Sequence, residues 1–107
     1  MRYEVVLAPA AVDGFRRLPA YTRGRVRDAL ERHLRHEPKK VSRSRIKRLR
    51  GVSRPQYRLR VDDIRIFYDV TETAVEVLAI IRKAEAEAWL GREGTPSESG
   101  GTGEGQG

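Results

Sequence analysis

The sequence lacks cysteine altogether and has few aromatic residues, with two phenylalanines, four tyrosines and one tryptophan among 107 residues. Without cysteine there can be no disulfide bond and no thiol chemistry, which fits a cytoplasmic protein. Neither of the two histidines, His33 and His36, is accompanied by a second kind of metal ligand, so we expect neither a metal site nor a cofactor. No apolar run approaches the length of a membrane span, and the N-terminus lacks the layout of a signal peptide, so no membrane association is expected.

Carboxylates are fewer than cations: the chain has 15 Asp and Glu and 22 Lys and Arg, so the formal net charge is +7. The segment from Gly91 onward carries one Arg and three Glu, which leaves 21 cations, 12 carboxylates and a net charge of +9 in the first ninety residues. Charged residues make up 35% of the chain, well above the roughly 25% of ordinary domains. This excess indicates a nucleic acid or an acidic protein as the partner.

Hydrophobic periodicity divides the first ninety residues into elements in the order β-α-α-β-β-β-α. Strands are expected at residues 2–8, 57–61, 64–70 and 74–81, and helices at 10–18, from Thr22 to Pro38 and at 84–90. Thr22 is a suitable N-cap for the second helix, and Gly91 is a suitable residue to end the third. Because short turns join the last three strands, we expect an α+β fold in which two helices pack on one face of a small antiparallel meander.

The two strands at residues 57–61 and 64–70 are expected to form a hairpin around the turn residues Asp62 and Asp63. In this register the apolar residues pair on one face, while Arg60 faces Arg65 and Arg58 lies beside Phe67 on the other. Like charges directly opposite each other destabilise a sheet, so converging guanidinium groups favour a binding site for a phosphate backbone. The alternative is a solvated face whose arginines point apart.

Ten Lys and Arg and no carboxylate occur between Lys39 and Arg60. A solvated loop would explain this composition, but Val41, Ile46 and Leu49 could anchor the segment along the edge of the sheet. We therefore expect a basic rim next to the arginine face of the hairpin. The residues of this rim assigned to nucleic-acid binding are Lys47, Arg48, Arg50 and Arg54.

The last 17 residues, from Gly91 to Gly107, hold seven of the ten glycines and almost no apolar residue. Burial cannot offset the entropy of ordering such a segment, so a disordered tail is expected at residues 91–107. Residues 1–90 are expected to form one domain.

The order of the elements, with LRG at 49–51, YRLRV at 57–61, IRIFYDV at 64–70 and VEVLAIIRKAEAEAW at 75–89, resembles the RelE/ParE superfamily of toxins from type II toxin–antitoxin modules. The resemblance covers nearly everything from Tyr3 to Leu90. It implies a cognate antitoxin, whose C-terminal segment would lie in the groove beside the sheet or against the first two helices. Exposed parts of Val26, Leu30 and Leu34 are candidate contacts, although core packing is the favoured use of these residues.

In the RelE-like branch, basic residues of the second and third strands surround the scissile phosphate of mRNA. The resemblance carries this role to Arg58, Arg60 and Arg65. A further cation after the last strand corresponds to Lys83, with Arg82 as the adjacent option. Trp89 stands where the family often has a tyrosine, and an indole can stack on a base but cannot exchange a proton.

The resemblance implies metal-independent cleavage of mRNA, in which the 2′-hydroxyl attacks its own phosphate, aided by the ribosome and inhibiting translation. The arginines would stabilise the phosphorane, whereas Glu85 and Glu87 are weak candidates for the general base because both lie on a helix of solvated charges. One alternative is a ParE-like, non-enzymatic inhibitor of DNA gyrase. Another is a relative that binds RNA but has lost catalysis.

Overall fold

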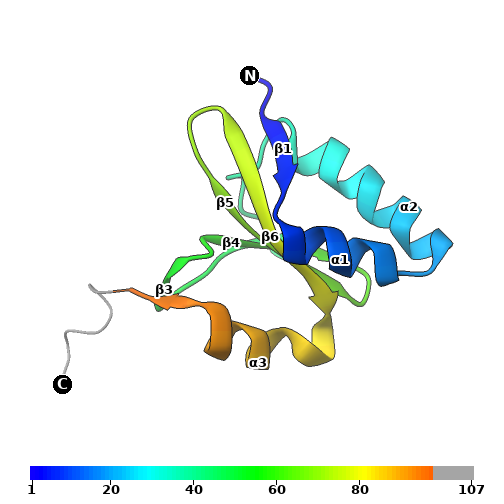
Figure 1. Ribbon diagram of the computed structural model, residues 1–107. Coiled ribbons are helices and arrows are strands. Elements are labelled where there is room, and N and C mark those ends of the chain that lie inside the picture. Colours follow the sequence, from blue (N-terminus) through cyan, green and yellow to red (C-terminus); the bar gives the residue numbers. More distant parts are fainter. Residues whose placement is uncertain (98–107) are drawn as a thin grey trace.

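The structure, a computed structural model, describes residues 1–97 and combines a mixed five-stranded sheet with three α-helices (Figure 1). Its elements, in chain order, are β1 (Glu4–Leu7), α1 (Pro9–Arg17), α2 (Ala20–Ala29), the π-helical turn η1 (Leu30–Leu34), β2 (Ile46–Arg48), β3 (Val52–Arg54), β4 (Tyr57–Val61), β5 (Ile64–Val70), β6 (Ala74–Arg82), α3 (Lys83–Glu93) and β7 (Thr95–Pro96).

The strands of the main sheet are ordered β1-β6-β5-β4-β2. Strands β4, β5 and β6 form the predicted antiparallel meander, and β1 joins its far side parallel to β6. The edge strand β2 lies inside the basic segment and pairs with β4, so the prediction that this segment runs along the sheet edge is confirmed. A separate two-stranded ribbon joins β3 to β7.

The hydrophobic core lies between the sheet and the helices α1, α2 and η1 (Figure 1). The predicted helical stripe is buried there, since Val26, Leu30 and Leu34 are each no more than 8% exposed. These three residues are therefore core residues rather than contacts for a partner. Helix α1 approaches β6 so closely that a Cβ at Gly14 would overlap the backbone oxygen of Ile80.

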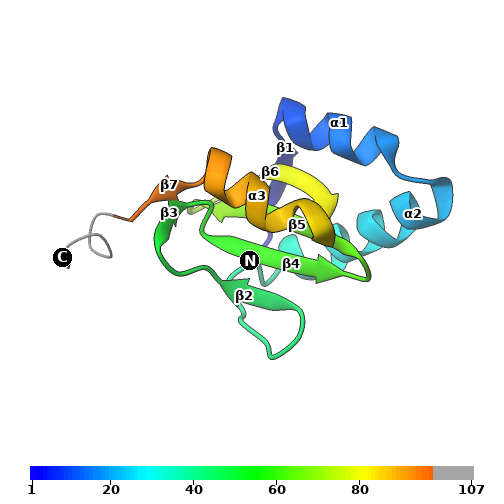
Figure 2. The same cartoon turned by 90° about the horizontal axis from the view of Figure 1, so that it is seen from below.

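The hairpin has the predicted register, with Arg60 opposite Arg65 and Arg58 opposite Phe67. Because side chains alternate along a strand, these four residues share the face that points away from α1 and α2. This second face is not bare, because α3 passes over β5 when the molecule is seen from below (Figure 2). A φ of +52° at Asp62 closes the turn, and Asp is among the residues that tolerate this conformation.

Two predicted helix ends are wrong. Helix α2 begins at Ala20 after Pro19, so Thr22 lies inside the first turn and does not cap the helix. Helix α3 continues through Gly91 to Glu93, and the strand β7 follows it. The tail predicted from Gly91 therefore begins with ordered residues, because pairing with β3 supplies backbone partners that composition does not reveal. Residues 98–107 of this predicted tail lie outside the described residues.

Candidate nucleic-acid interface

Four cationic residues are brought together by β2, β4 and β5 on the face away from α1 and α2. Lys47, Arg58 and Phe67 form one row across the three strands, and Arg60 and Arg65 form part of the next row. We call Arg58, Arg60 and Arg65 the arginine face. Lys47 extends it toward the sheet edge, and its side chain is exposed.

Arg58 is the central member of the arginine face and is only partly exposed. Its Nε is buried and has no hydrogen-bond partner among the described residues. Burial lowers the pKa of Arg58, and the nearby charges of Arg65 and Arg60 lower it further. The guanidinium is therefore held in a place that lacks a compensating anion, the condition under which a phosphate would bind most favourably.

Arg65 is the most buried charged side chain of the described part, at 7% exposure. Its Nη1 donates hydrogen bonds of 2.9 Å to the Asp62 carbonyl and 3.1 Å to the Ile64 carbonyl, so this residue also holds the hairpin turn in shape. Arg60 is exposed. Within residues 1–97, no carboxylate forms an ion pair with any member of the arginine face.

Arg82 and Lys83 lie at the same end of the sheet as the hairpin turn. The backbone N–H of Lys83 donates to the Asp63 carbonyl at 2.8 Å, and Arg82 Nη1 is 3.7 Å from Asp63 Oδ2. Both side chains are exposed. The structure thus brings the start of α3 close to the hairpin turn that Arg65 holds. The charge of Arg82 is partly neutralised there by Asp63.

Trp89 stacks on Phe67, with 5.0 Å between the ring centroids and an angle of 13° between the planes. This contact attaches α3 to the middle of the arginine-bearing face, in the row that also contains Arg58. One face of the indole is therefore used to pack the helix. Glu85 and Glu87 are exposed on the same helix.

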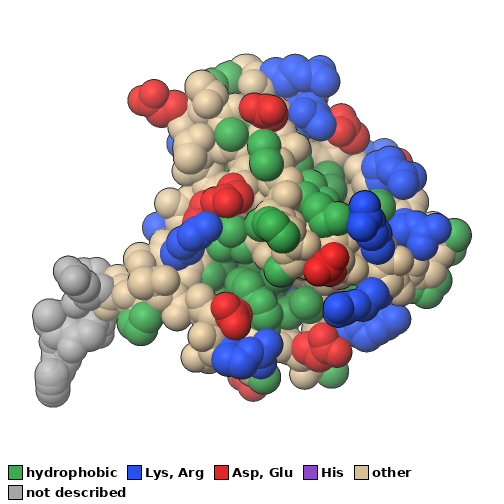
Figure 3. Space-filling model, viewed as in Figure 1, with side chains coloured by type: hydrophobic (Ala, Val, Ile, Leu, Met, Phe, Trp, Pro, Cys, Tyr) green, Lys and Arg blue, Asp and Glu red, His purple; other side chains and the backbone are tan. Residues whose placement is uncertain are grey.

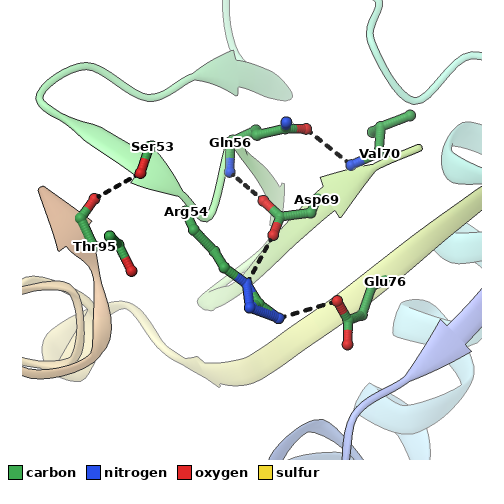
Figure 4. Close-up of polar contacts among 7 residues, drawn as sticks. All are labelled: Ser53, Arg54, Gln56, Asp69, Val70, Glu76 and Thr95. Atoms are coloured by element: carbon green, nitrogen blue, oxygen red, sulfur yellow. Dashed lines mark hydrogen bonds and ion pairs between the residues drawn. The ribbon is translucent and has the colours of Figure 1, made fainter. Parts of the chain in front are cut away.

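Arg54 forms ion pairs with two acidic residues, Asp69 and Glu76 (Figure 4). Its Nε lies 3.0 Å from Asp69 Oδ2, and its Nη2 lies 3.0 Å from Glu76 Oε1. Asp69 also accepts a hydrogen bond of 2.8 Å from the Gln56 backbone, and burial raises the pKa of Asp69. This network connects β3 to β5 and β6, so we assign Arg54 a structural role.

Arg48 and Arg50, the remaining predicted rim residues, are exposed but do not join the arginine face. Arg48 lies over the ring of Tyr57, at 5.1 Å from its centroid, and donates a hydrogen bond of 3.1 Å to the Gln56 carbonyl. In the register of β2 and β4 it opposes Tyr57, on the other parity from Lys47. Arg50 follows the end of β2.

Sequence reasoning missed Arg45 as a site residue. The Arg60 backbone N–H donates to the Arg45 carbonyl at 2.9 Å, which continues the register of β2 and β4 and places Arg45 beside Arg60. The period-2 pattern of Arg45, Ile46 and Lys47, with only Ile46 buried, was the available signal.

A groove of about 590 Å³ lies next to the arginine face, between α1, β6 and α3, and its lining includes Ile81, the cross-strand partner of Arg65. Leu18, Ile81 and Trp89 contribute apolar surface, and the charged residues of the lining are Asp13, Arg17, Arg82, Glu85 and Arg92. Hydrophobic side chains gather in this region in the space-filling view, with charged side chains around them (Figure 3). The groove therefore offers an apolar strip with a charged border.

Within residues 1–97, no three His, Cys, Asp or Glu side chains are grouped so that they could hold a metal ion. In the same part of the chain, no helix has both the length and the apolar character required to cross a membrane.

Comparisons with known proteins agree on one superfamily. The family model of the ParE toxin of type II toxin–antitoxin systems, parDE, matches residues 5–87. The RelB–RelE antitoxin–toxin complex from Methanococcus jannaschii contains a similar fold, with a TM-score of 0.60 and 18% identity over 79% of this chain and 98% of that chain. The RelE–RelB complex from Pyrococcus horikoshii OT3 gives a TM-score of 0.55 and 25% identity over 78% of this chain and 97% of that chain. No curated protein sequence matches the chain.

Proposed function

Since this chain belongs to the ParE toxin family and is a RelE/ParE superfamily toxin of a type II toxin–antitoxin system, we propose that it acts as an endoribonuclease. Its substrate is mRNA bound to the ribosome. Cleavage needs no metal ion, and its consequence is the inhibition of translation. The arginine face is the site that receives the scissile phosphate.

The observation that carries this proposal is the buried, unpartnered Nε of Arg58 between two other arginines. A protein surface with a purely structural role would place a carboxylate or a neutral residue there, because opposed like charges destabilise a sheet. A phosphate between Arg58 and Arg60 would relieve the repulsion, and rotation of the Arg58 guanidinium toward it would give the buried Nε–H the acceptor that it lacks. Arginine suits this task, because its fixed charge and forked donors match the oxygens of a phosphate.

The reaction proposed is an intramolecular displacement in the RNA. The 2′-oxygen loses its proton and bonds to phosphorus, and the bond from phosphorus to the 5′-oxygen breaks, which leaves a 2′,3′-cyclic phosphate and a 5′-hydroxyl. Arg58 and Arg60 stabilise the negative charge of the phosphorane. Arg65 holds the turn that positions them, and Lys83, at the start of α3, donates the proton to the departing 5′-oxygen. The proton of the 2′-hydroxyl is taken up within the ribosomal complex.

The partner that restrains this toxin is a cognate antitoxin, as in the RelB–RelE complexes with which its fold agrees. We assign the antitoxin segment to the groove between α1, β6 and α3, because this groove combines apolar surface with charged margins. An amphipathic segment could bury apolar side chains against Leu18 and Trp89 while its acidic residues pair with Arg17 and Arg92.

A second candidate function is the inhibition of DNA gyrase without catalysis. The match to the ParE family model favours it, and so does the packing of Trp89 against Phe67, which occupies one face of the ring expected to stack on a base. The arginine face favours RNA as the ligand, because protein recognition alone does not require an arginine with a buried, unpartnered Nε.

Mapping of transcript ends after induced expression distinguishes these functions. Wild type is compared with Arg58→Met, which removes the central charge and keeps an unbranched side chain, and with Arg16→Met as a control on an exposed arginine of α1. We expect new transcript ends with wild type and the control but none with Arg58→Met. Intact transcripts in arrested cells, together with loss of supercoiling by purified gyrase, would contradict the ribonuclease proposal and support the gyrase alternative.

A further inference from the structure

A cavity of about 350 Å³ lies beside the arginine face, between α2, η1 and the end of β4. Its lining includes Arg25, Arg32, Arg45, Arg60 and Asp62. Arg60 therefore belongs both to this cavity and to the arginine face. We call the cavity the lateral cavity.

The charge of the lateral cavity is positive and largely uncompensated. Arg25 and Asp62 neutralise each other, with 2.7 Å from Nε to Oδ2 and 2.9 Å from Nη2 to Oδ1. Among the described residues, no carboxylate pairs with Arg32, Arg45 or Arg60. The remaining carboxylate of the lining belongs to Asp28, so the unpaired arginines outnumber it.

The pKa of His33 responds to the positive charge of the lateral cavity. His33 lines this cavity and is partly buried. Burial lowers the pKa of His33, and the charges of Arg45 and Arg32 lower it further, although Glu37 opposes this effect. Two arginines from separate elements, η1 and the segment before β2, are thus close enough to act on one imidazole.

We propose that the lateral cavity is a second phosphate site, which binds a backbone phosphate of the same RNA strand that occupies the arginine face. This inference rests on the proposed function for the identity of the ligand. Arg60 links the two sites around the edge of the sheet, so one continuous strand can contact both. The cavity suits a phosphate better than a peptide, because Ala29 and Val61 are the apolar residues of its lining and a peptide would find few apolar anchors there.

The test is the salt dependence of RNA binding by the full-length protein. The probe is a fluorescent single-stranded RNA with 2′-O-methyl groups, which prevent cleavage, and anisotropy gives the affinity at several salt concentrations. The variants are Arg32→Ala and Arg45→Ala, with Arg45→Lys to retain the charge and Arg16→Ala as a control away from the lateral cavity. Circular dichroism verifies that each variant is folded.

Each lost phosphate contact on a single strand is expected to reduce the salt slope by about 0.7, which corresponds to about five-fold weaker binding at 0.1 M salt. We expect this change for Arg32→Ala and Arg45→Ala, and a wild-type slope for Arg45→Lys and Arg16→Ala. Wild-type slopes in both alanine variants, or a wild type that does not bind RNA, would overturn the inference. Weakened binding of an acidic antitoxin peptide with unchanged RNA binding would overturn it in favour of a protein ligand. Because the probe cannot be cleaved, failure of the ribonuclease proposal would appear in the transcript ends and not in these slopes.

Discussion

Replacing Arg58 with methionine is expected to stabilise the fold and abolish toxicity together. A buried donor without a partner costs about 1–3 kcal/mol, and repulsion from Arg65 and Arg60 adds to this cost. Solvent still reaches part of the Arg58 side chain, so we take the lower end and expect a gain of about 1 kcal/mol in the free energy of unfolding. For a domain of this size, that gain raises Tm by about 4–8 °C.

Thermal unfolding measures the first effect, and growth after induced expression measures the second. Arg16→Met is the matched control, because Arg16 is exposed on α1, and substitutions at such sites usually change stability by less than about 0.5 kcal/mol. A lower Tm for Arg58→Met would show that Arg58 supports the fold, and the reasoning from its missing partner would then be wrong. Full toxicity in a stabilised Arg58→Met variant would refute the functional part.

Four further substitutions test the fold. Gly14→Ala is expected to lower the free energy of unfolding by about 1–3 kcal/mol in urea denaturation, because its Cβ meets a backbone oxygen of β6. Gly24→Ala, where a Cβ meets nothing within 4 Å, is expected to raise it by up to about 1 kcal/mol, and equal effects at the two glycines would contradict this packing. Tyr68→Phe is expected to cost about 1–3 kcal/mol in the same assay, because the buried hydroxyl donates at 2.7 Å to a backbone carbonyl that would lose its partner; an unchanged midpoint would refute that role. The hydrogen bond with Arg25 lowers the pKa of Asp62, so this carboxylate contributes stability above its unfolded pKa of about 3.9 that is lost as pH falls through the folded pKa. Asp62→Asn should therefore flatten the acid limb of a plot of Tm against pH, and an unchanged limb would contradict the assignment.

The sequence was sufficient to predict the hairpin and its cross-strand pairs. Side-chain alternation has a period of two, so the apolar residues of β4 and β5 permit one register once the turn is located at Asp62. The position of Arg58, Arg60 and Arg65 on one face followed from this local pattern alone.

Contacts between residues far apart in the sequence explain what the sequence did not reveal. Arg54 was assigned to nucleic-acid binding, but its partners Asp69 and Glu76 lie 15 and 22 residues away in sequence, and only the folded sheet brings them within reach. The end of α3 was misplaced for the same reason, because β7 and β3 stabilise each other across more than 40 residues. Local signals contain no information about such contacts.

The role of Trp89 could not be predicted from the sequence, because it depends on where α3 crosses the sheet. A tryptophan after a strand of apolar residues is compatible with base stacking or with packing, and both leave the same pattern in the sequence. The structure shows that one face of the indole packs, because α3 crosses the sheet where Phe67 can stack on it, and base stacking by the other face stays a prediction. Within residues 1–97, the arginine face remains the part of the predicted site whose members form no ion pair with a carboxylate.

The most direct test of a phosphate on the arginine face is the NMR signal of the Arg58 Nε–H group during titration with the 2′-O-methyl RNA. The Arg58→Met variant identifies the signal by its disappearance. We predict that RNA moves the Hε resonance downfield and slows its exchange with water, because the unpartnered donor acquires a phosphate acceptor. An RNA that binds while the Arg58 signal stays unchanged would contradict the account.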